Sequence, residues 1–332
     1  MKKRNLAIAV GGAAAAAVAV KMLTRAETVR WDDVASMVPH SDRSRFINVD
    51  GIRLHYQEFG DVSAPPLILI HGYTASAYVW KTSAPKLAES GCRVIAVDLV
   101  GFGYSEKPRW FDYSIQAQAR IIARFMERLG IGRAVIVGSS YGGAVALNLA
   151  LDYAEKAARL VLVDTVINDA PKRHPILRLA ALPGVGEVIT PFFVDSKAFL
   201  RLRMRGTLAP ANHHLISDER IESIRRPLHA ADAHHSVLAT SRNWFADRIQ
   251  QDAELITQPT LIIWGDQDSV IPIRHGYRLH RLMLNSRMVV IRDCGHVPQE
   301  EKSELFCELV TEFCRDAKGR ISEPDERAEL VA

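Results

Sequence analysis

The sequence predicts an α/β fold, in which helices flank a mostly parallel β-sheet and a helical cap is inserted into the core. Short apolar segments rich in β-branched residues alternate with longer amphipathic segments in the first half of the chain. This alternation is typical of βαβ units. It stops at about residue 167, where prolines divide a run of helical pieces, and it resumes at about residue 251. One helical insertion into an α/β core accounts for both observations.

The strands are expected in two kinds. Segments 46–49 and 53–59 flank Asp50-Gly51, a two-residue sequence typical of the turn in an antiparallel hairpin. The later strands are continuous apolar runs, which is typical of strands buried on both faces of a parallel sheet. These later strands are expected at 66–70, 93–99, 134–138, 160–164, 260–264 and 288–291.

Helical patterns occupy the intervals between these strands, and the chain divides into five regions. The helices are expected at about 76–89, 114–129, 141–153, 274–284 and 301–315. The regions are a leader (1–26), a linker (27–45), a core in two parts (46–166 and 251–315), a helical cap (167–250) and a charged, disordered tail (316–332).

The leader combines a basic start with an apolar run. Lys2, Lys3 and Arg4 precede apolar residues 6–20, which fits a membrane anchor or a cleavable secretory signal. The run is shorter than the roughly 20 residues that span a bilayer, so both alternatives stay open, with the anchor favoured and a cytosolic amphipathic segment as a third alternative. Because the basic residues precede the apolar run, we expect the folded domain on the exported, periplasmic or extracytoplasmic side of the membrane.

Composition excludes several classes of protein. Hydrophobic residues make up 48% of the 332 residues and charged residues 24%, as in ordinary globular proteins. The net charge of +4 comes from the leader, so the rest of the chain offers no basic excess for nucleic acid. The four cysteines are too few for a disulfide scaffold and lack zinc-ligand spacing, so no structural metal is expected.

A nucleophile motif lies between a strand and a helix. The sequence Gly138-Ser139-Ser140-Tyr141-Gly142 follows an apolar strand and opens a helical segment. In a G-x-S-x-G motif the serine lies at a sharp turn, and glycines are needed two residues to either side because side chains there would collide. This context makes Ser140 the predicted nucleophile.

A serine nucleophile needs a base, and the base needs an orienting acid. The strand at 260–264 ends in a loop with Asp266 and Asp268, and the strand at 288–291 is followed by His296. Both loops are expected at the same sheet edge as Ser140. The chain order serine, acid, histidine is the order expected for a fold of this kind.

At this point the chain resembles the α/β-hydrolase superfamily, over roughly residues 46–315. The shared features are His71-Gly72-Tyr73, the turn at 98–105, Gly138–Gly142, Trp264–Asp268 and Gly295–Pro298. The resemblance implies an eight-stranded sheet with a site between core and cap. It favours Asp268 over Asp266 as the acid, with Asp164, at the end of an earlier strand, as the fallback.

The resemblance also implies an oxyanion hole made by the backbone N–H groups of Tyr73 and Tyr141. Tyr73 could alternatively line the pocket, and His71 is expected to be a structural hydrogen-bonding residue. The glycines at 101 and 103 are expected to form a tight turn rather than a phosphate cradle. No cofactor is required for acyl transfer by Ser140, His296 and Asp268.

Six histidines lie in the cap, but none has metal-ligand spacing, so no metal is expected there; they are His174, His213, His214, His229, His234 and His235. Apolar cap residues are expected either to line an acyl pocket or to pack the cap on the core. They are Ile176–Leu182, Phe192–Val194 and Phe199-Leu200. Cys294 is expected to be a buried apolar side chain rather than a nucleophile.

A serine at this turn disfavours epoxide opening and halide displacement, because the relatives that perform them use an aspartate there. The main hypothesis is a serine esterase or lipase that cleaves small-molecule carboxylic esters, with an apolar, lipid-like or shorter acyl group, through an acyl-enzyme. The alternative is a carbon–carbon bond hydrolase that acts on vinylogous diketones with the same triad and cap. A third hypothesis, a non-catalytic binding protein, is disfavoured because all three triad positions are filled.

Overall fold

Within residues 29–168, 181–315 and 329–331, which the computed structural model describes, nine strands form one sheet in the order β1-β2-β4-β3-β5-β6-β7-β8-β9. β1 (Ser44–Val49) pairs with β2 (Ile52–Phe59) through the two-residue turn, and β2 pairs antiparallel with β4 (Arg93–Val97). The remaining neighbours are parallel. They are β3 (Pro66–Ile70), β5 (Ala134–Ser139), β6 (Ala157–Val163), β7 (Thr260–Gly265), β8 (Ser286–Ile291) and β9 (Glu329–Val331).

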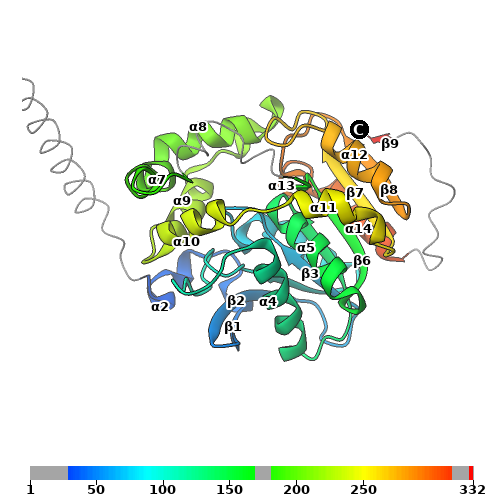
Figure 1. Cartoon of the computed structure of the whole chain (residues 1–332), viewed down its shortest axis with the longest axis horizontal. Coiled ribbons are helices and arrows are strands. Elements are labelled where there is room, and N and C mark those ends of the chain that lie inside the picture. The colour runs from blue at the N-terminus through cyan, green and yellow to red at the C-terminus, as the bar shows by residue number, and fades with distance from the viewer. Residues whose placement is uncertain (1–28, 169–180, 316–328, 332) are drawn as a thin grey trace, which may run out of the picture.

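The sheet is buried on both faces, as its apolar strands predict. In β3, Ile68 and Ile70 belong to one apolar core, while Leu67 and Leu69 belong to the other. The first core is covered by α4 (Ile115–Arg128), α5 (Tyr141–Asp152) and α12 (Arg274–Leu282). The second is covered by α3 (Ser83–Glu89) and α14 (Ser303–Arg315), so helices lie on both sides of the sheet (Figure 1).

The eight expected strands and the α/β architecture are confirmed, with strand limits that shift by up to three residues, while other expectations differ. The expected helix at 76–89 divides into a 3₁₀ turn at Ala77–Trp80 and α3, and the one at 301–315 is preceded by the short α13 (Pro298–Glu301). Within the expected linker at 27–45, residues 31–43 form short helical turns, with Trp31 packed against Phe46. The expected disordered tail was wrong for Glu329–Val331, which pairs with β8 as β9.

The cap consists of helices inserted between β6 and β7, as expected, and it lies over the carboxyl edge of the sheet (Figure 1). Two of these helices have a serine as N-cap. The hydroxyl of Ser196 accepts a hydrogen bond from the N–H of Phe199, and that of Ser217 accepts one from the N–H of Arg220. The cap helices are α7 (Val185–Asp195), α8 (Lys197–Thr207), α9 (Asp218–Leu228), α10 (Ala233–Arg242) and α11 (Asp247–Asp252), with a 3₁₀ segment at Pro210–Leu215.

The predicted leader (1–26) lies outside the described residues. Among the helices that are described, none has the length and apolar character needed to cross a bilayer.

Candidate active site

Ser140 lies at the sharp turn between β5 and α5. Its backbone has φ +55° and ψ −116°, a conformation that a non-glycine residue keeps only where the surrounding structure enforces it. A Cβ atom at Gly138 would lie 2.4 Å from the carbonyl oxygen of Gly142, and one at Gly142 would lie 2.3 Å from that of Ile70. Both positions therefore require glycine, and the turn leaves the Ser140 side chain free to face the cap.

Ser140, His296 and Asp268 form one hydrogen-bonded chain. His296 Nε2 lies 3.0 Å from Ser140 Oγ, and His296 Nδ1 lies 2.8 Å from Asp268 Oδ2. The backbone N–H groups of Val270 and Ile271 donate to Asp268 Oδ1 at 2.8 and 2.9 Å. His296 can therefore accept the proton of the serine hydroxyl while Asp268 orients the ring and stabilises the imidazolium that forms.

The two other acids named by the sequence analysis lie in different places. Asp266 is exposed, and its Oδ1 accepts from the backbone N–H of Cys294 at 3.2 Å. Asp164 is fully buried at the end of β6, where its Oδ1 accepts from the N–H of Gly265 at 3.0 Å. Neither makes the hydrogen bond to the imidazole that Asp268 makes.

The two backbone N–H groups expected to bind an oxyanion lie next to Ser140. Tyr141 is the first residue of α5, and Tyr73 follows Gly72, where a Cβ atom would lie 3.1 Å from Ser140 Cβ. Within the described ranges neither amide has a protein acceptor. Both N–H groups are therefore available to negative charge that develops beside Ser140.

His71 has the structural role expected of it. Its Nδ1–H donates to the carbonyl oxygen of Gly72 at 2.8 Å, and its Nε2 accepts from the N–H of Leu99 at 3.0 Å. Burial lowers the pKa of the ring, so the neutral form joins the turns that follow β3 and β4. The glycines at 101 and 103 have positive φ angles of 90° and 50°, consistent with a tight turn.

Cys294 is fully buried, and burial raises the pKa of its thiol. The thiol therefore stays protonated at neutral pH and is a poor nucleophile.

A cavity of about 300 Å³ opens onto Ser140 and His296. Its walls are mostly apolar, and the cap supplies Met204 of α8, Ile224 of α9 and Trp244 beyond α10. Tyr73 also lines the cavity, and its hydroxyl donates to the carbonyl oxygen of Val237 in α10 at 2.8 Å. The site thus lies between core and cap, as the resemblance implied.

The apolar cap residues proposed from the sequence do not line this cavity, as far as they are described. Phe192 is 53% exposed, Phe193 packs against Phe199 at 4.5 Å between ring centroids, and Leu200 is buried within the cap. Residues 176–180 lie outside the described ranges. The cap residues that line the cavity, such as Met204, Ile224 and Trp244, were not found by sequence reasoning, whereas Tyr73 was named there as a possible lining residue.

Arg203 places a positive charge in the cavity wall. Its Nη1 donates to Thr74 Oγ1 at 3.1 Å, and Thr74 directly follows Tyr73 of the oxyanion turn. Burial lowers the pKa of the guanidinium below its usual value, but the group stays cationic at neutral pH. In the described part of the chain, no carboxylate forms an ion pair with it. The charge is therefore available to an anionic group in the cavity.

The other cavity arginine differs in this respect. Arg220 of α9 forms a buried ion pair with Glu300 of α13, with two guanidinium nitrogens facing the two carboxylate oxygens. Burial lowers the pKa of Arg220 to about 10. This pair joins cap to core and leaves no charge for a substrate.

The cap histidines do not form a metal site within the described ranges. His229 Nδ1 and His234 Nε2 each lie 3.2 Å from the carboxylate of Asp195. No three cap side chains there bring ligand atoms within metal-binding distance of one another. His174 lies outside the described residues.

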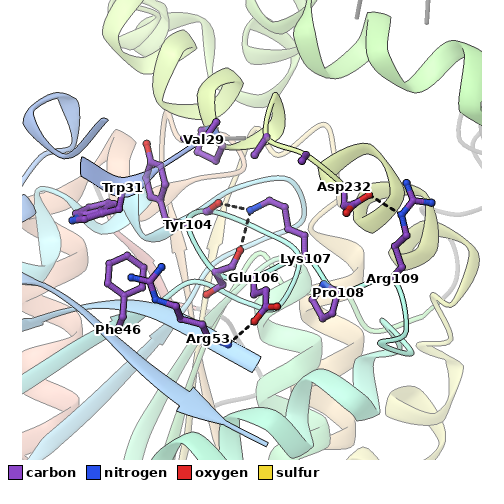
Figure 2. Close-up of a pocket in the computed structure, with 15 residues that line it drawn as sticks. Val29, Trp31, Phe46, Arg53, Tyr104, Glu106, Lys107, Pro108, Arg109 and Asp232 are labelled. Carbon is purple, nitrogen blue, oxygen red and sulfur yellow. Dashed lines mark hydrogen bonds and ion pairs between the residues drawn. The ribbon is translucent and has the colours of Figure 1, made fainter. Parts of the chain in front are cut away.

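A second cleft, of about 540 Å³, lies where the N-terminal segment, the turn after β4 and the cap meet (Figure 2). Lys107 donates to two backbone carbonyls of its own turn, and Arg109 pairs with Asp232 of the cap. The guanidinium of Arg53 lies 3.7 Å from the centre of the Phe46 ring. The cleft contains no residue of the triad.

Comparison with known proteins places this geometry in a family. Residues 65–303 match the family described as the alpha/beta hydrolase fold. The 2-hydroxymuconate semialdehyde hydrolase of Pseudomonas sp. (strain CF600) is 30% identical over 284 residues, which are 82% of this chain and 94% of the relative.

Two solved structures are similar over most of their length. A meta-cleavage product hydrolase from Pseudomonas fluorescens IP01 has a TM-score of 0.70 at 29% identity, over 82% of this chain and 98% of that one. A membrane phospholipase A, described as a bacterial virulence factor, has a TM-score of 0.69 at 25% identity, over 96% of this chain and 100% of that one. Since the family match covers well over half of the sequence, including the turn at Ser140 and the loops of Asp268 and His296, the chain belongs to the α/β-hydrolase family.

Proposed function

We propose that this hydrolase cleaves a carbon–carbon bond beside the ketone of a vinylogous diketone that carries a carboxylate. The observation that carries the proposal is the cationic side chain of Arg203, which faces the cavity near the oxyanion turn without a described acidic partner. A partly buried guanidinium favours an anionic group in its surroundings, since a carboxylate satisfies both its charge and its hydrogen-bond donors.

The triad can carry out this reaction in two steps. Ser140 attacks the ketone carbon as His296 accepts its proton, and the oxyanion is bound by the two backbone N–H groups. The bond between the ketone carbon and the neighbouring carbon then breaks. Its electron pair passes into the conjugated system of the leaving acid, which becomes a dienolate. His296 returns the proton to the enolate oxygen of the leaving dienolate, and a water molecule then hydrolyses the acyl-enzyme. One water is consumed, giving a carboxylic acid and a dienoic acid.

The leaving group distinguishes this reaction from ester hydrolysis. An alkoxide leaves with a proton from His296 and needs no further cation. A dienolate that also bears a carboxylate carries two negative charges. The carboxylate is ionised from the start, and the charge of Arg203 stabilises the second charge, on the enolate, as it develops.

The relatives support the same direction. Both the 2-hydroxymuconate semialdehyde hydrolase and the solved meta-cleavage product hydrolase carry names of this reaction class. They favour the alternative of the sequence analysis over its main hypothesis, esterase or lipase activity.

The test compares two arginines of helix α8. Arg203→Gln removes the charge from the cavity, whereas Arg205→Gln removes an exposed charge two residues further along the same helix. With a 2-hydroxy-6-oxo-dienoate as substrate, followed by loss of its visible absorbance, we expect kcat/KM to fall roughly 10- to 100-fold for Arg203→Gln, the value of a hydrogen bond to a charged group. Arg205→Gln should stay within about twofold. Equal effects of the two substitutions, or no turnover by the wild type, would contradict the proposal.

A second candidate function is ester hydrolysis at a membrane, the main hypothesis of the sequence analysis. It is favoured by the similarity to a membrane phospholipase A, which extends over 96% of this chain, and by the mostly apolar cavity. With it goes the proposal that residues 1–26 anchor an exported catalytic domain.

The same preparation separates the two candidates. A panel of p-nitrophenyl esters of increasing acyl length, together with a phospholipid in mixed micelles, measures the ester activity. Higher kcat/KM for esters than for dienoates, unaffected by Arg203→Gln, would establish the second candidate. Retention of the full-length chain in carbonate-washed membranes would support the anchor, and intact protein in the cytosolic fraction would contradict it.

A further inference from the structure

Asp164 is a buried acid beside the triad that the mechanism described above does not use. It directly follows β6, has no exposed surface, and adopts a positive φ of 43°. β6 lies next to β7, the strand whose following loop carries Asp268. The sheet thus brings a second carboxyl group to the back of the catalytic acid.

The contacts of Asp164 are incomplete for an ionised carboxylate. Its Oδ1 accepts one hydrogen bond, from the N–H of Gly265. Its Oδ2 is buried and has no hydrogen-bond partner in the described part of the chain. A carboxylate oxygen of Asp164, one of Asp268 and a ring nitrogen of His296 all lie within 4.8 Å of one another. Two buried carboxylates this close do not both ionise, because their repulsion in a low dielectric is too large.

We propose that Asp164 is a positioning residue that carries a proton on Oδ2 and donates it in a hydrogen bond to Asp268. The two acids then share one proton and one negative charge. The proton satisfies the Oδ2 atom that is otherwise without a partner. The hydrogen bond adds a contact on the side of Asp268 that faces β6, in addition to those from Val270, Ile271 and His296.

The surroundings place the proton on Asp164 rather than on Asp268. Asp268 accepts two backbone N–H bonds and the bond from His296, and each of these stabilises its anionic form. Among the described residues, Asp164 accepts one N–H bond, from Gly265. Burial, and next the negative charge of Asp268, raise the pKa of Asp164 well above its usual value, and Glu301 contributes in the same direction.

Two further titratable groups near Asp164, Cys294 and Glu301, are compatible with this assignment. Burial raises the pKa of the Cys294 thiol, with further contributions from Glu301 and Asp164, so the thiol stays neutral. Glu301 is anchored by backbone N–H donors on the histidine loop and the cap. The negative charge that His296 meets directly is therefore that of Asp268.

The decisive comparison is between asparagine and glycine at position 164. The asparagine side chain of Asp164→Asn would keep the shape, would accept from Gly265 and could donate an N–H to Asp268 as the protonated acid does. Asp164→Gly removes the side chain without backbone strain, because glycine and asparagine both tolerate a positive φ. We expect Asp164→Asn to stay within about threefold of the wild type, and Asp164→Gly to lose roughly 10- to 100-fold, the value of one hydrogen bond to a charged group.

The readout is the rate at which a fluorophosphonate labels Ser140. This rate reports the activated serine whatever the natural substrate is, so the inference can fail or succeed independently of the proposed function. If Asp164→Asn is as slow as Asp268→Asn, Asp164 is an ionised acid and the proposal is wrong. If Ser140 is labelled as fast in Asp164→Gly as in the wild type, Asp164 does not position the triad and the proposal is wrong.

Two measurements separate this role from a merely structural one. The infrared carbonyl band of a protonated carboxyl group should be present in the wild type at pH 7 and absent from Asp164→Asn; its absence from the wild type overturns the proposal even if the glycine variant does not fold. When the labelling rate is plotted against pH, its decrease on the acid side (the acid limb) should occur at the same pH for the wild type and Asp164→Asn. A displaced acid limb in Asp164→Asn would mean that an ionised carboxylate had been removed, and it would overturn the proposal.

Discussion

Replacing Glu301 by glutamine tests how the catalytic histidine is held in place. Glu301 is the last residue of α13, five residues after His296, and its side chain is buried. Its two carboxylate oxygens join the histidine loop to the chain segment that leaves helix α8 of the cap. These oxygens accept hydrogen bonds from the backbone N–H groups of Gly295, Val297 and Ala209 and from the side-chain amide of Asn212.

The cost follows from this arrangement. Oε1 accepts hydrogen bonds from Gly295 and Val297, whereas Oε2 accepts them from Ala209, Asn212 and Gly295. The glutamine side chain can place its NH₂ group at the position of either Oε1 or Oε2. In both orientations the NH₂ group faces N–H donors, so at least one buried N–H group loses its acceptor. Each such group costs about 1–3 kcal/mol, so the free energy of unfolding should fall by on the order of 3 kcal/mol. For a domain of this size that corresponds to a decrease in Tm of roughly 5 °C.

Thermal unfolding and fluorophosphonate labelling, measured on the same samples, check both consequences. Labelling should slow as well, because the loop of His296 loses its anchor on both sides. Glu304→Gln is the matched control: its side chain is 82% exposed and pairs with Lys86, and exposed pairs contribute little to stability. A Glu301→Gln variant with the Tm and labelling rate of the wild type would refute this reasoning.

Three further outcomes are expected. Ser140→Ala should lower turnover by about a thousandfold or more while Tm is preserved, measured as kcat on whichever substrate the wild type accepts; most of the activity remaining would exclude Ser140 as nucleophile. Asp268→Asn should severely reduce kcat by imposing the wrong imidazole tautomer, whereas Asp266→Asn should have a mild effect, and the reverse order would assign the acid differently. Burial lowers the pKa of Lys107 to about 8, so the folded state binds fewer protons than the unfolded state between about pH 8 and 10.5. The unfolding free energy of the wild type relative to Lys107→Met should therefore rise across that window in urea titrations, and a constant difference would contradict the shift.

The parts of the fold that the sequence predicted well are those governed by local rules. The turn at Ser140 needs glycine on both sides because backbone atoms of neighbouring segments approach it, and only glycine leaves room for them. Parallel strands buried on both faces must be continuously apolar, so they were visible as short runs. Ser140, His296 and the two candidate acids Asp266 and Asp268 then followed from where strands end, and the family resemblance favoured Asp268.

Features that depend on packing between distant segments were not predictable in this way. Arg203 looks like one of several arginines on a polar helix, and only the orientation of α8 over the core turns it toward the cavity. Asp164 was considered as a substitute for Asp268, whereas the structure brings both acids together behind one histidine. β9 was missed because a strand of three residues is too short to show a periodic pattern in the sequence.

The edge position of β9 has a practical meaning for anyone who expresses this protein. β9 covers the hydrogen-bonding edge of β8 through the register Val289–Glu329 to Ile291–Val331, and β8 leads into the loop of His296. Shortening the chain to residue 315 would leave an apolar strand with unpaired backbone groups at the border of the sheet, the arrangement that invites pairing with a second molecule. Affinity tags are therefore better separated from Val331 by a flexible spacer, and a truncated product is expected to elute as aggregates in size-exclusion chromatography.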